Sequence, residues 1–127
     1  MNKIECARML YEALPGGKEI YIEHMQAYGE VLLHVLVGDL INEPLIELLR
    51  RNKNRELIQL YCKLIERMWQ EGDAEVVNVV DVTILERLSD ELDVWKYFGD
   101  YVSEEFKMYV NEEVIPNNLM MPPYELE

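Results

Sequence analysis

With 127 residues, 50% of them hydrophobic, the chain can bury the core of one domain, and this composition argues against intrinsic disorder. Its 25 acidic residues outnumber its 12 Lys and Arg residues and give a formal net charge of −13 at pH 7. So acidic a chain repels nucleic acids and anionic membrane surfaces, and it attracts basic proteins or cations more weakly as salt rises. The same excess has a second explanation, because net charge also keeps a cytoplasmic protein soluble.

No apolar run approaches the roughly 18–20 residues that span a bilayer, since the longest, residues 31–37, is interrupted by His34. Glu5 stands where a signal peptide carries its apolar segment, so we expect a cytoplasmic protein. Cys6 and Cys62 lack C-x-x-C spacing and lie among apolar residues. This pattern predicts buried, reduced thiols, with a stray disulfide as the alternative.

Apolar residues three and four positions apart run through most of the chain and predict an all-α fold. The first predicted helix covers residues 2–14 and ends at Pro15, which cannot continue it. A second, weaker helix covers residues 18–28 and ends or bends at Gly29. His24 lies on this weakly amphipathic helix and is expected at the surface or half-buried.

Residues 30–51 show a third helical pattern, which two residues interrupt. A glycine inside a helix costs about 1 kcal/mol relative to alanine. Its presence at position 38 therefore predicts a site where two helices pack closely. Pro44 lacks an amide donor and predicts a kink or a new helix start, with Asn42 as the cap of that start.

Two further helices have clear start signals. Residues 55–71 carry a wide apolar stripe behind the predicted cap Asn54, and they stop at Gly72. Asp73 then caps residues 74–88, which are apolar nearly all round and rich in valine. A buried strand is the alternative for this segment, but its length favours a central buried helix.

The last third of the chain predicts a short helix over residues 93–98 and another over residues 104–113, which Ser103 caps. Residues 117–127 form a tail whose apolar side chains favour packing on the body. Together these elements predict a single helical domain, residues 1–127. We expect a compact bundle of about six antiparallel helices, with HEAT-like stacking of helix pairs as one arrangement.

Candidate polar residues are densest around His34. On a helix, Glu30 lies one turn before His34 on the same face, so its carboxylate can orient the imidazole. With Asp39 and Asn78 these residues are predicted to form a buried polar network that fixes how two central helices meet. The alternative is a metal-dependent enzyme centred on Glu30, His34 and Asp39, although the spacing matches no established metal motif.

Acidic residues are concentrated in the last third, with aromatic residues interleaved. Aromatic anchors ringed by charge suit an electrostatically steered protein interface. In the alternative interpretation, Trp95 and Phe98 fill the core and the acids are only solvated. The candidate partner-binding residues are Asp90, Glu91, Asp93, Trp95, Tyr97, Asp100, Tyr101 and Glu104.

One stretch has the pattern G-E-x-L-x-H-x-x-x-G-D-L, carried by Gly29, Glu30, Leu32, His34, Gly38, Asp39 and Leu40. Two later pieces follow, G-D-x-E-V-x-N at residues 72–78 and L-E-x-L at residues 85–88. In these pieces the chain resembles a family of small acidic bacterial proteins of unknown function, over residues 21–110. It departs from that family at Leu33, where the family has a proline. The resemblance implies the helical fold, a bacterial origin and, more loosely, likeness to immunity partners of secreted toxins.

No nucleophile elbow, phosphate-binding loop or zinc-ligand spacing occurs in the sequence, so no cofactor is expected. The predicted function is a non-catalytic, cytoplasmic protein-binding module of the immunity or antitoxin type, which neutralises a basic bacterial toxin. A general helical adaptor with another protein partner is the alternative. Neither a nucleic acid nor a membrane is expected as a partner.

Overall fold

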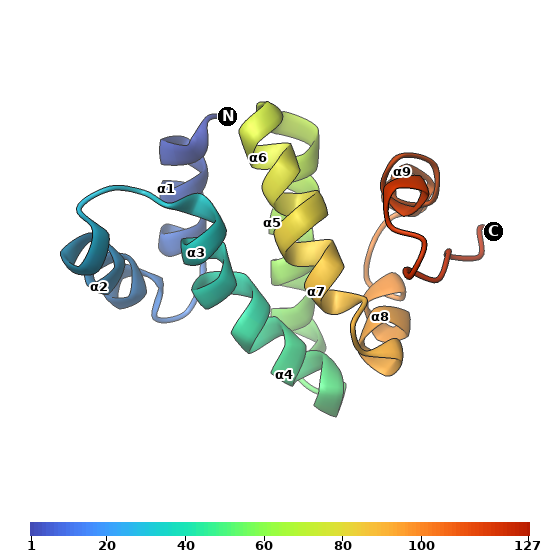
Figure 1. The fold of residues 1–127 in the computed structure, drawn as a ribbon. Helices are drawn as coiled ribbons and strands as arrows, with labels where there is room; N and C mark the ends of the chain where they lie inside the picture. Colours follow the sequence, from blue (N-terminus) through green and yellow to red (C-terminus); the bar gives the residue numbers. More distant parts are fainter.

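The computed structural model describes residues 1–127 and confirms the all-α fold, with no β-strand. Seven continuous helices, rather than about six, succeed one another across the molecule, from an N-terminal pair to the C-terminal tail at the opposite end (Figure 1). Four of them are plain α-helices, namely α1 (Lys3–Ala13), α2 (Gly17–Tyr28), α5 (Arg55–Glu71) and α8 (Leu92–Gly99).

The other three helices are composite, because each contains a π-helical segment in which hydrogen bonds join residues five apart. In the first, η1 (Gly38–Asn42) joins α3 (Leu33–Val37) to α4 (Glu43–Arg51). In the second, η2 (Val79–Leu85) joins α6 (Ala74–Asn78) to α7 (Glu86–Leu88). In the third, α9 (Glu104–Tyr109) continues through η3 (Val110–Val114) into the 3₁₀ turn η4 (Ile115–Asn117).

The predicted kink or restart at Pro44 takes a different form, since the helix runs through the proline. The Glu43 N–H donates to the Gly38 carbonyl, five residues back, so the chain widens into η1 just before Pro44. A proline has no N–H for a regular helical bond, and the wider turn accommodates this loss. Asn42 does not cap a new helix, because it has helical angles, φ −57° and ψ −55°, and makes no capping hydrogen bond.

The predicted caps of three other helices are confirmed. The side chains of Asn54, Asp73 and Ser103 each accept a hydrogen bond from the backbone N–H three residues further on. Each such cap contributes about 0.5–2 kcal/mol relative to alanine, because it satisfies an N–H that has no partner inside the helix. The starts of α5, α6 and α9 therefore follow from local sequence.

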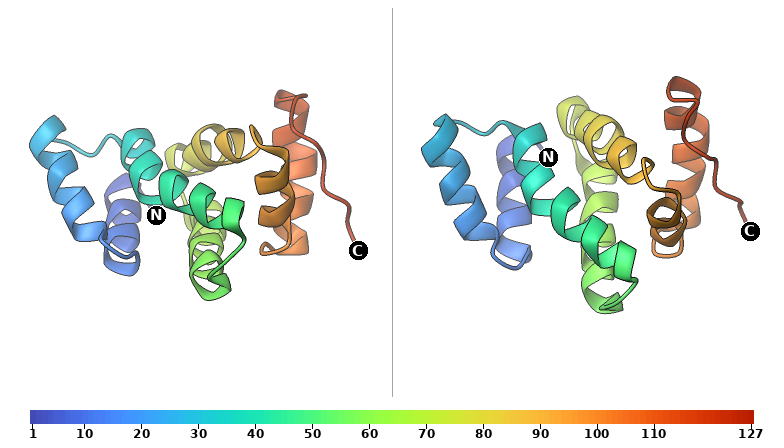
Figure 2. Two further views of the ribbon diagram at one scale, coloured as in Figure 1. Left: turned by 90° about the horizontal axis from the view of Figure 1, so that it is seen from below. Right: turned by 60° about the horizontal axis from the view of Figure 1, so that its bottom comes forward.

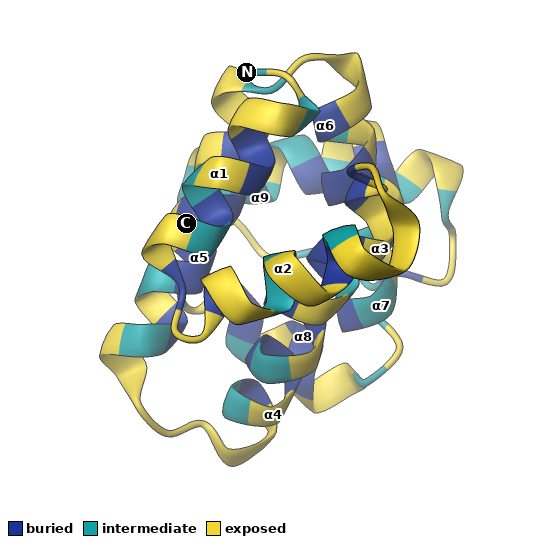
Figure 3. Ribbon diagram, turned by 90° about the vertical axis from the view of Figure 1, so that its left-hand side faces the viewer, coloured by how far each residue is buried: buried dark blue, intermediate teal, exposed yellow.

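One continuous core of 33 buried residues runs through the molecule. Helix α1 packs against α2, the α3–η1 segment crosses η2, and α4 packs on both α5 and α8. Figure 2 shows the same order of helices from two other directions, and Figure 3 shows that the exposed faces of α1, α2 and α3 point outward. Aromatic rings dominate the C-terminal part of the core, where Phe106 contacts Trp69, Phe98 and Tyr109.

Two predictions in the first half of the chain are wrong. Gly38 is not a site of close packing, since a Cβ added there would meet no atom within 4 Å. His24 is buried, with 4% of its surface exposed. Its Nε2 accepts a hydrogen bond from the Leu32 N–H at 3.0 Å, which ties the linker between α2 and α3 back onto α2. The spacing of apolar residues in the sequence does not indicate this contact between His24 and the linker.

Both cysteines are buried and unpaired, as predicted. Burial raises the pKa of the Cys6 thiol to about 12 and also raises the pKa of the Cys62 thiol. Because the thiolate is the reactive form, we expect neither cysteine to react with Ellman's reagent near pH 8 in the folded protein, and both to react in denaturant. Absorbance of the released thionitrobenzoate measures this. Equally fast reaction in the folded and unfolded protein would contradict the prediction.

Asp81 is a half-buried acid that joins η2 to α9. Each of its carboxylate oxygens lies 2.8 Å from the Tyr109 hydroxyl, which donates to them. Burial raises the pKa of Asp81, while the hydrogen bond from Tyr109 acts in the opposite direction. The ionised carboxylate therefore costs stability above its folded-state pKa, and the cost is relieved as the pH falls through that pKa.

The variant Asp81→Asn removes this charge and keeps an acceptor for Tyr109. We expect it to stabilise the protein near pH 7 by on the order of 0.5–1 kcal/mol, a value discounted for half-burial. The gain should vanish as the pH falls through the folded-state pKa of Asp81. Urea unfolding of both proteins over a pH series measures the difference, with Asp93→Asn at an exposed site as the control. A gain that persists unchanged at low pH would contradict the assignment.

Candidate protein-binding surface

Helix α8 has one face in the core and one at the surface. Trp95 and Phe98 are 1% and 0% exposed, whereas Leu92 is 58% exposed. The acids at either end of the helix, Asp93 and Asp100, are also exposed. Because residues three and four apart share a helix face, Asp93, Lys96 and Asp100 lie together on the exposed side of α8, whereas Val94, Trp95 and Phe98 form its core side.

A groove of about 580 Å³ runs between α8 and the tail. Its lining combines the half-buried ring of Tyr97 with charges of both signs, namely Asp93, Asp100, Glu125, Lys96 and Lys107. The tail that forms the other wall is held by hydrogen bonds. The Trp95 Nε1 donates to the Pro122 carbonyl at 2.7 Å, and the Tyr124 hydroxyl donates to the Trp95 carbonyl at 2.6 Å. The shape of the groove therefore depends on where the tail lies.

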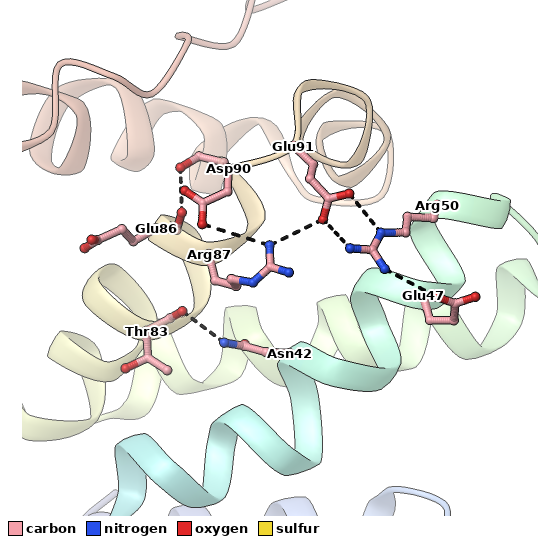
Figure 4. Close-up of polar contacts among 9 residues, drawn as sticks. Asn42, Glu47, Arg50, Thr83, Glu86, Arg87, Asp90 and Glu91 are labelled. Atoms are coloured by element: carbon pink, nitrogen blue, oxygen red, sulfur yellow. Dashed lines mark hydrogen bonds and ion pairs between the residues drawn. The ribbon is translucent and has the colours of Figure 1, made fainter.

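An ion-pair network fixes the start of α8 against α4 (Figure 4). The Arg50 guanidinium donates to both oxygens of Glu91, from Nε and Nη2, at 2.8 Å each. Arg87 Nη1 donates to the same carboxylate at 3.3 Å, and Glu47 lies 3.5 Å from Arg50 on its other side. A bidentate pair of this kind sets geometry as well as energy. The hydrogen bond from Arg50 is the main cause that holds the pKa of Glu91 below its usual range.

A second junction lies where α3–η1 crosses η2. The Asn42 Nδ2 donates to the Thr83 carbonyl at 3.1 Å (Figure 4), and the Thr83 hydroxyl is hydrogen-bonded to His34 Nδ1 at 2.5 Å. Asn42 is buried, and its Oδ1 has no hydrogen-bond partner. Thr83 therefore connects the two central composite helices through both its backbone and its side chain.

Unpaired acids dominate the C-terminal part of the surface. From residue 86 onward the chain has 11 acidic residues and three basic ones. Only three of these acids, Asp90, Glu91 and Glu104, form ion pairs with Lys or Arg. Half of all Lys and Arg residues lie instead between residues 50 and 67, around the α4–α5 turn and along α5. The charge is thus segregated toward α8, α9 and the tail, where a negative potential attracts cationic groups.

Sequence comparison places the protein in a family. The family model for a domain of unknown function, DUF7674, matches residues 7–115. The chain belongs to this family. The match confirms the resemblance to an uncharacterised family and covers every helix from α2 to α9.

The chain is also similar to curated proteins named dual-action ribosomal maturation protein DarP. The protein from Shewanella sp. (strain MR-4) is 31% identical over 88 residues, and that from Shewanella sp. (strain ANA-3) is 28% identical over 87 residues. Each match covers 64% of this chain and 49% of the relative, so the chain spans about half the length of the curated relatives it matches. No solved structure matches the chain.

The eight predicted interface residues differ in their accessibility. The prediction that Trp95 is a surface anchor is wrong, because its ring lies in the core and stacks on Tyr124 at a centroid distance of 4.7 Å. The alternative interpretation, in which Trp95 and Phe98 fill the core, is confirmed for both rings. Glu91 is held by Arg50, as described above. Glu104 pairs with Lys107 at 2.9 Å.

Tyr101 uses its hydroxyl to donate to Asn52 at 3.1 Å, which ties the end of α8 to the α4–α5 turn. The accessible members of the predicted surface are three exposed acids and a half-buried aromatic residue, namely Asp90, Asp93, Asp100 and Tyr97. They remain the candidate partner-binding residues.

The predicted buried network of Glu30, His34, Asp39 and Asn78 is wrong, because all four residues are exposed. Gly29 ends α2 in a left-handed conformation, φ +71°, and the next helix begins only at Leu33. Glu30 therefore lies outside the helix that carries His34, and the expected one-turn spacing does not exist. His34 is instead bonded to Thr83, as described above.

Glu30, His34 and Asp39 do not converge on a metal site, and the structure contains no group of three or more His, Cys, Asp or Glu side chains that could hold a metal ion. Asp39 lies in a separate groove of about 700 Å³ that Arg50 and Arg87 also line. None of the helices has the length and apolar character that a bilayer crossing requires.

Sequence reasoning missed the residues that hold the tail. Asn111 donates through Nδ2 to the Tyr124 carbonyl at 2.7 Å and accepts from the Tyr124 N–H at 2.8 Å. Gly99 leaves room for the tyrosine ring, since a Cβ there would lie 2.5 Å from a ring carbon of Tyr124. The Pro122-Pro123-Tyr124 segment is the sequence signal that could have indicated this contact. Two prolines favour an extended backbone whose polar groups are free to bond to other parts of the chain.

Proposed function

We propose that this protein is a non-catalytic binding module that takes a basic protein as its partner, of the immunity or antitoxin type. The observation that carries the proposal is the accessible face of α8, where the exposed Leu92 is followed by the unpaired acids Asp93 and Asp100, with one exposed base, Lys96, between them. An interface needs apolar area for affinity, and complementary charge raises the association rate and selects the partner. A basic toxin offers the matching charge, and binding can cover its active site.

A second candidate comes from the named relatives. The Shewanella proteins are named as ribosomal maturation proteins, which favours a partner associated with the ribosome. A net charge of −13 opposes direct contact with ribosomal RNA, so the contact in this candidate is a basic protein of the ribosome. Both candidates use the same acidic surface and differ only in the identity of the partner.

Affinity capture from a lysate of the source bacterium tests both candidates. Purified chain is immobilised and washed at low and at high salt, and the eluted proteins are identified by mass spectrometry. A stoichiometric basic protein that dissociates at high salt supports the proposal, and its identity separates a toxin from a ribosomal component. Capture that is equal at both salt concentrations, or of acidic proteins only, would refute it, because screening weakens attraction between exposed charges.

A further inference from the structure

A single imidazole holds the linker between α2 and α3. Gly29 ends α2 with φ +71°, and α3 begins at Leu33. Among the N–H groups of residues 30–32, only that of Leu32 has a hydrogen-bond partner in the chain, namely Nε2 of His24 at 3.0 Å. The linker also carries a core residue, since Val31 is 4% exposed. The bond from His24 therefore fastens to α2 a segment that has few other hydrogen bonds.

This bond defines the protonation state of His24. A ring nitrogen accepts a hydrogen bond only when it carries no proton, so the proton of the neutral ring sits on Nδ1. The residue is 4% exposed, and its Nδ1 is buried with no hydrogen-bond partner. The folded chain thus keeps a neutral histidine in place, although one of its two nitrogens is unsatisfied.

The charged form of His24 does not fit the same site. Both nitrogens of an imidazolium are donors, so Nε2–H would meet the Leu32 N–H, and Nδ1–H would still lack an acceptor. No carboxylate forms an ion pair with either nitrogen within 4.0 Å. Because a buried charge without a partner is costly, proton uptake breaks the bond and drives the ring toward solvent.

The charges around α2 favour the ring once it has moved out. The elements that pack on α2 are α1, α3 and η1. On these elements, α2 and the linker, the acids are Glu5, Glu12, Glu19, Glu23, Glu30 and Asp39, all exposed, and the bases are Lys3, Arg8 and Lys18. The tyrosines bring no charge near neutral pH, and the ring of Tyr28 lies 4.9 Å from the imidazole, centroid to centroid. An imidazolium at the surface is therefore in an attractive field.

We propose that His24 is a pH-sensitive latch for the linker at residues 29–32. The neutral ring holds the linker on α2, and proton uptake releases it and uncovers Val31. Histidine is the side chain that changes charge between pH 5 and 8, so the latch opens on mild acidification. It lies at the opposite end of the molecule from α8 and is independent of the proposed function (Figure 1).

The other histidine of the chain provides a contrast. His34 is exposed, and its Nδ1 bonds to the Thr83 hydroxyl, which can either donate or accept. Proton uptake by His34 therefore only reverses the direction of its hydrogen bond. The chain has two histidines, so one is a matched control for the other.

Hydrogen exchange of the Leu32 amide, read by NMR in the full-length chain from pH 8 to pH 5, tests the latch. Protection factors are compared, because they correct for the pH dependence of exchange in an unstructured chain. If one proton opens the latch, the protection of Leu32 falls by about tenfold for each pH unit below about 6.5. We also expect Leu32 to be at least about tenfold less protected than Ile65 in the core of α5, because the linker opens locally.

Two variants assign the loss of protection. His24→Gln supplies an amide oxygen that accepts from Leu32 and does not titrate, so its protection should not change with pH. His34→Gln should keep the loss seen in the wild type. This second variant leaves His24 as the only histidine, so the assignment stands even if His24→Gln does not fold. Asp81 cannot mimic the loss, because protonation of its half-buried carboxylate stabilises the folded chain.

Three results would overturn the inference. The first is equal protection of Leu32 at pH 8 and pH 5 in the wild type. The second is a loss that His34→Gln abolishes. The third is equal protection of Leu32 and Ile65 at each pH, which would mean that the linker opens only when the whole chain unfolds. None of these results bears on the basic partner proposed for α8.

Discussion

Replacing Trp95 by alanine is expected to destabilise the protein by about 3–5 kcal/mol, the cost typical of a buried aromatic residue. The ring is 1% exposed, packs between Phe98 and Tyr124, and holds the tail through its Nε1 hydrogen bond to the Pro122 carbonyl. Its removal leaves a cavity and also an unpaired carbonyl group. Urea or guanidinium unfolding monitored by circular dichroism measures the loss.

Leu92→Ala is the matched control, because Leu92 lies one turn before Trp95 on the same helix and is 58% exposed. We expect this substitution to change the free energy of unfolding by only about 0.5 kcal/mol or less. If Trp95→Ala proved as mild as Leu92→Ala and instead weakened partner binding, the ring would be a surface anchor after all, and its placement in the core would be wrong.

Reversing the charge of Asp90, Asp93 and Asp100 to lysine is expected to slow association with the captured partner by at least about tenfold at low salt. All three side chains are exposed, and only Asp90 has a Lys or Arg nitrogen within 4.0 Å, that of Arg87. Glu91 is left intact because it positions α8 through Arg50. Stopped-flow association rates over a range of salt concentrations measure the effect, which should shrink as screening increases.

The control carries Glu12→Lys, Glu19→Lys and Glu23→Lys, three exposed acids of α1 and α2 without ion-pair partners. Both variants change the net charge by the same amount, and the control changes it at the far end of the molecule (Figure 1). We expect the control to slow association much less. Equal slowing by the two variants would mean that only total charge matters, and it would remove the case for a binding surface on α8.

Local sequence signals predicted most of the fold. The stop at Gly72 and the caps Asn54 and Asp73 gave the bounds of α5 and the start of α6 to the residue, because capping depends on groups a few residues apart. The buried stripe of α5 also followed from its periodicity. The sequence leaves the burial of Trp95 open, because a solvated acid run and a charged interface have the same composition.

The candidate site was predicted less well, for a different reason. The sequence pattern places Glu30 and His34 on one helix, but that helix begins at Leu33, three residues after Glu30, and the predicted contact is lost. The contacts of His24 with Leu32 and of Asn111 with Tyr124 join segments that only the folded chain brings together. No pattern of residue spacing contains such contacts, so sequence reasoning could not have assigned them.

The π segments have a consequence for how buried residues are spaced. In a regular α-helix a step of four residues overshoots a full turn by about 40°, so three such steps carry a side chain about 120° round the axis. Yet Val76, Val80, Ile84 and Leu88 are all 0% exposed. The π segment η2 holds roughly one extra residue in its turn and cancels the drift. Buried apolar residues that repeat every four positions over three steps are therefore a mark of a π-helical segment that can be sought in other sequences.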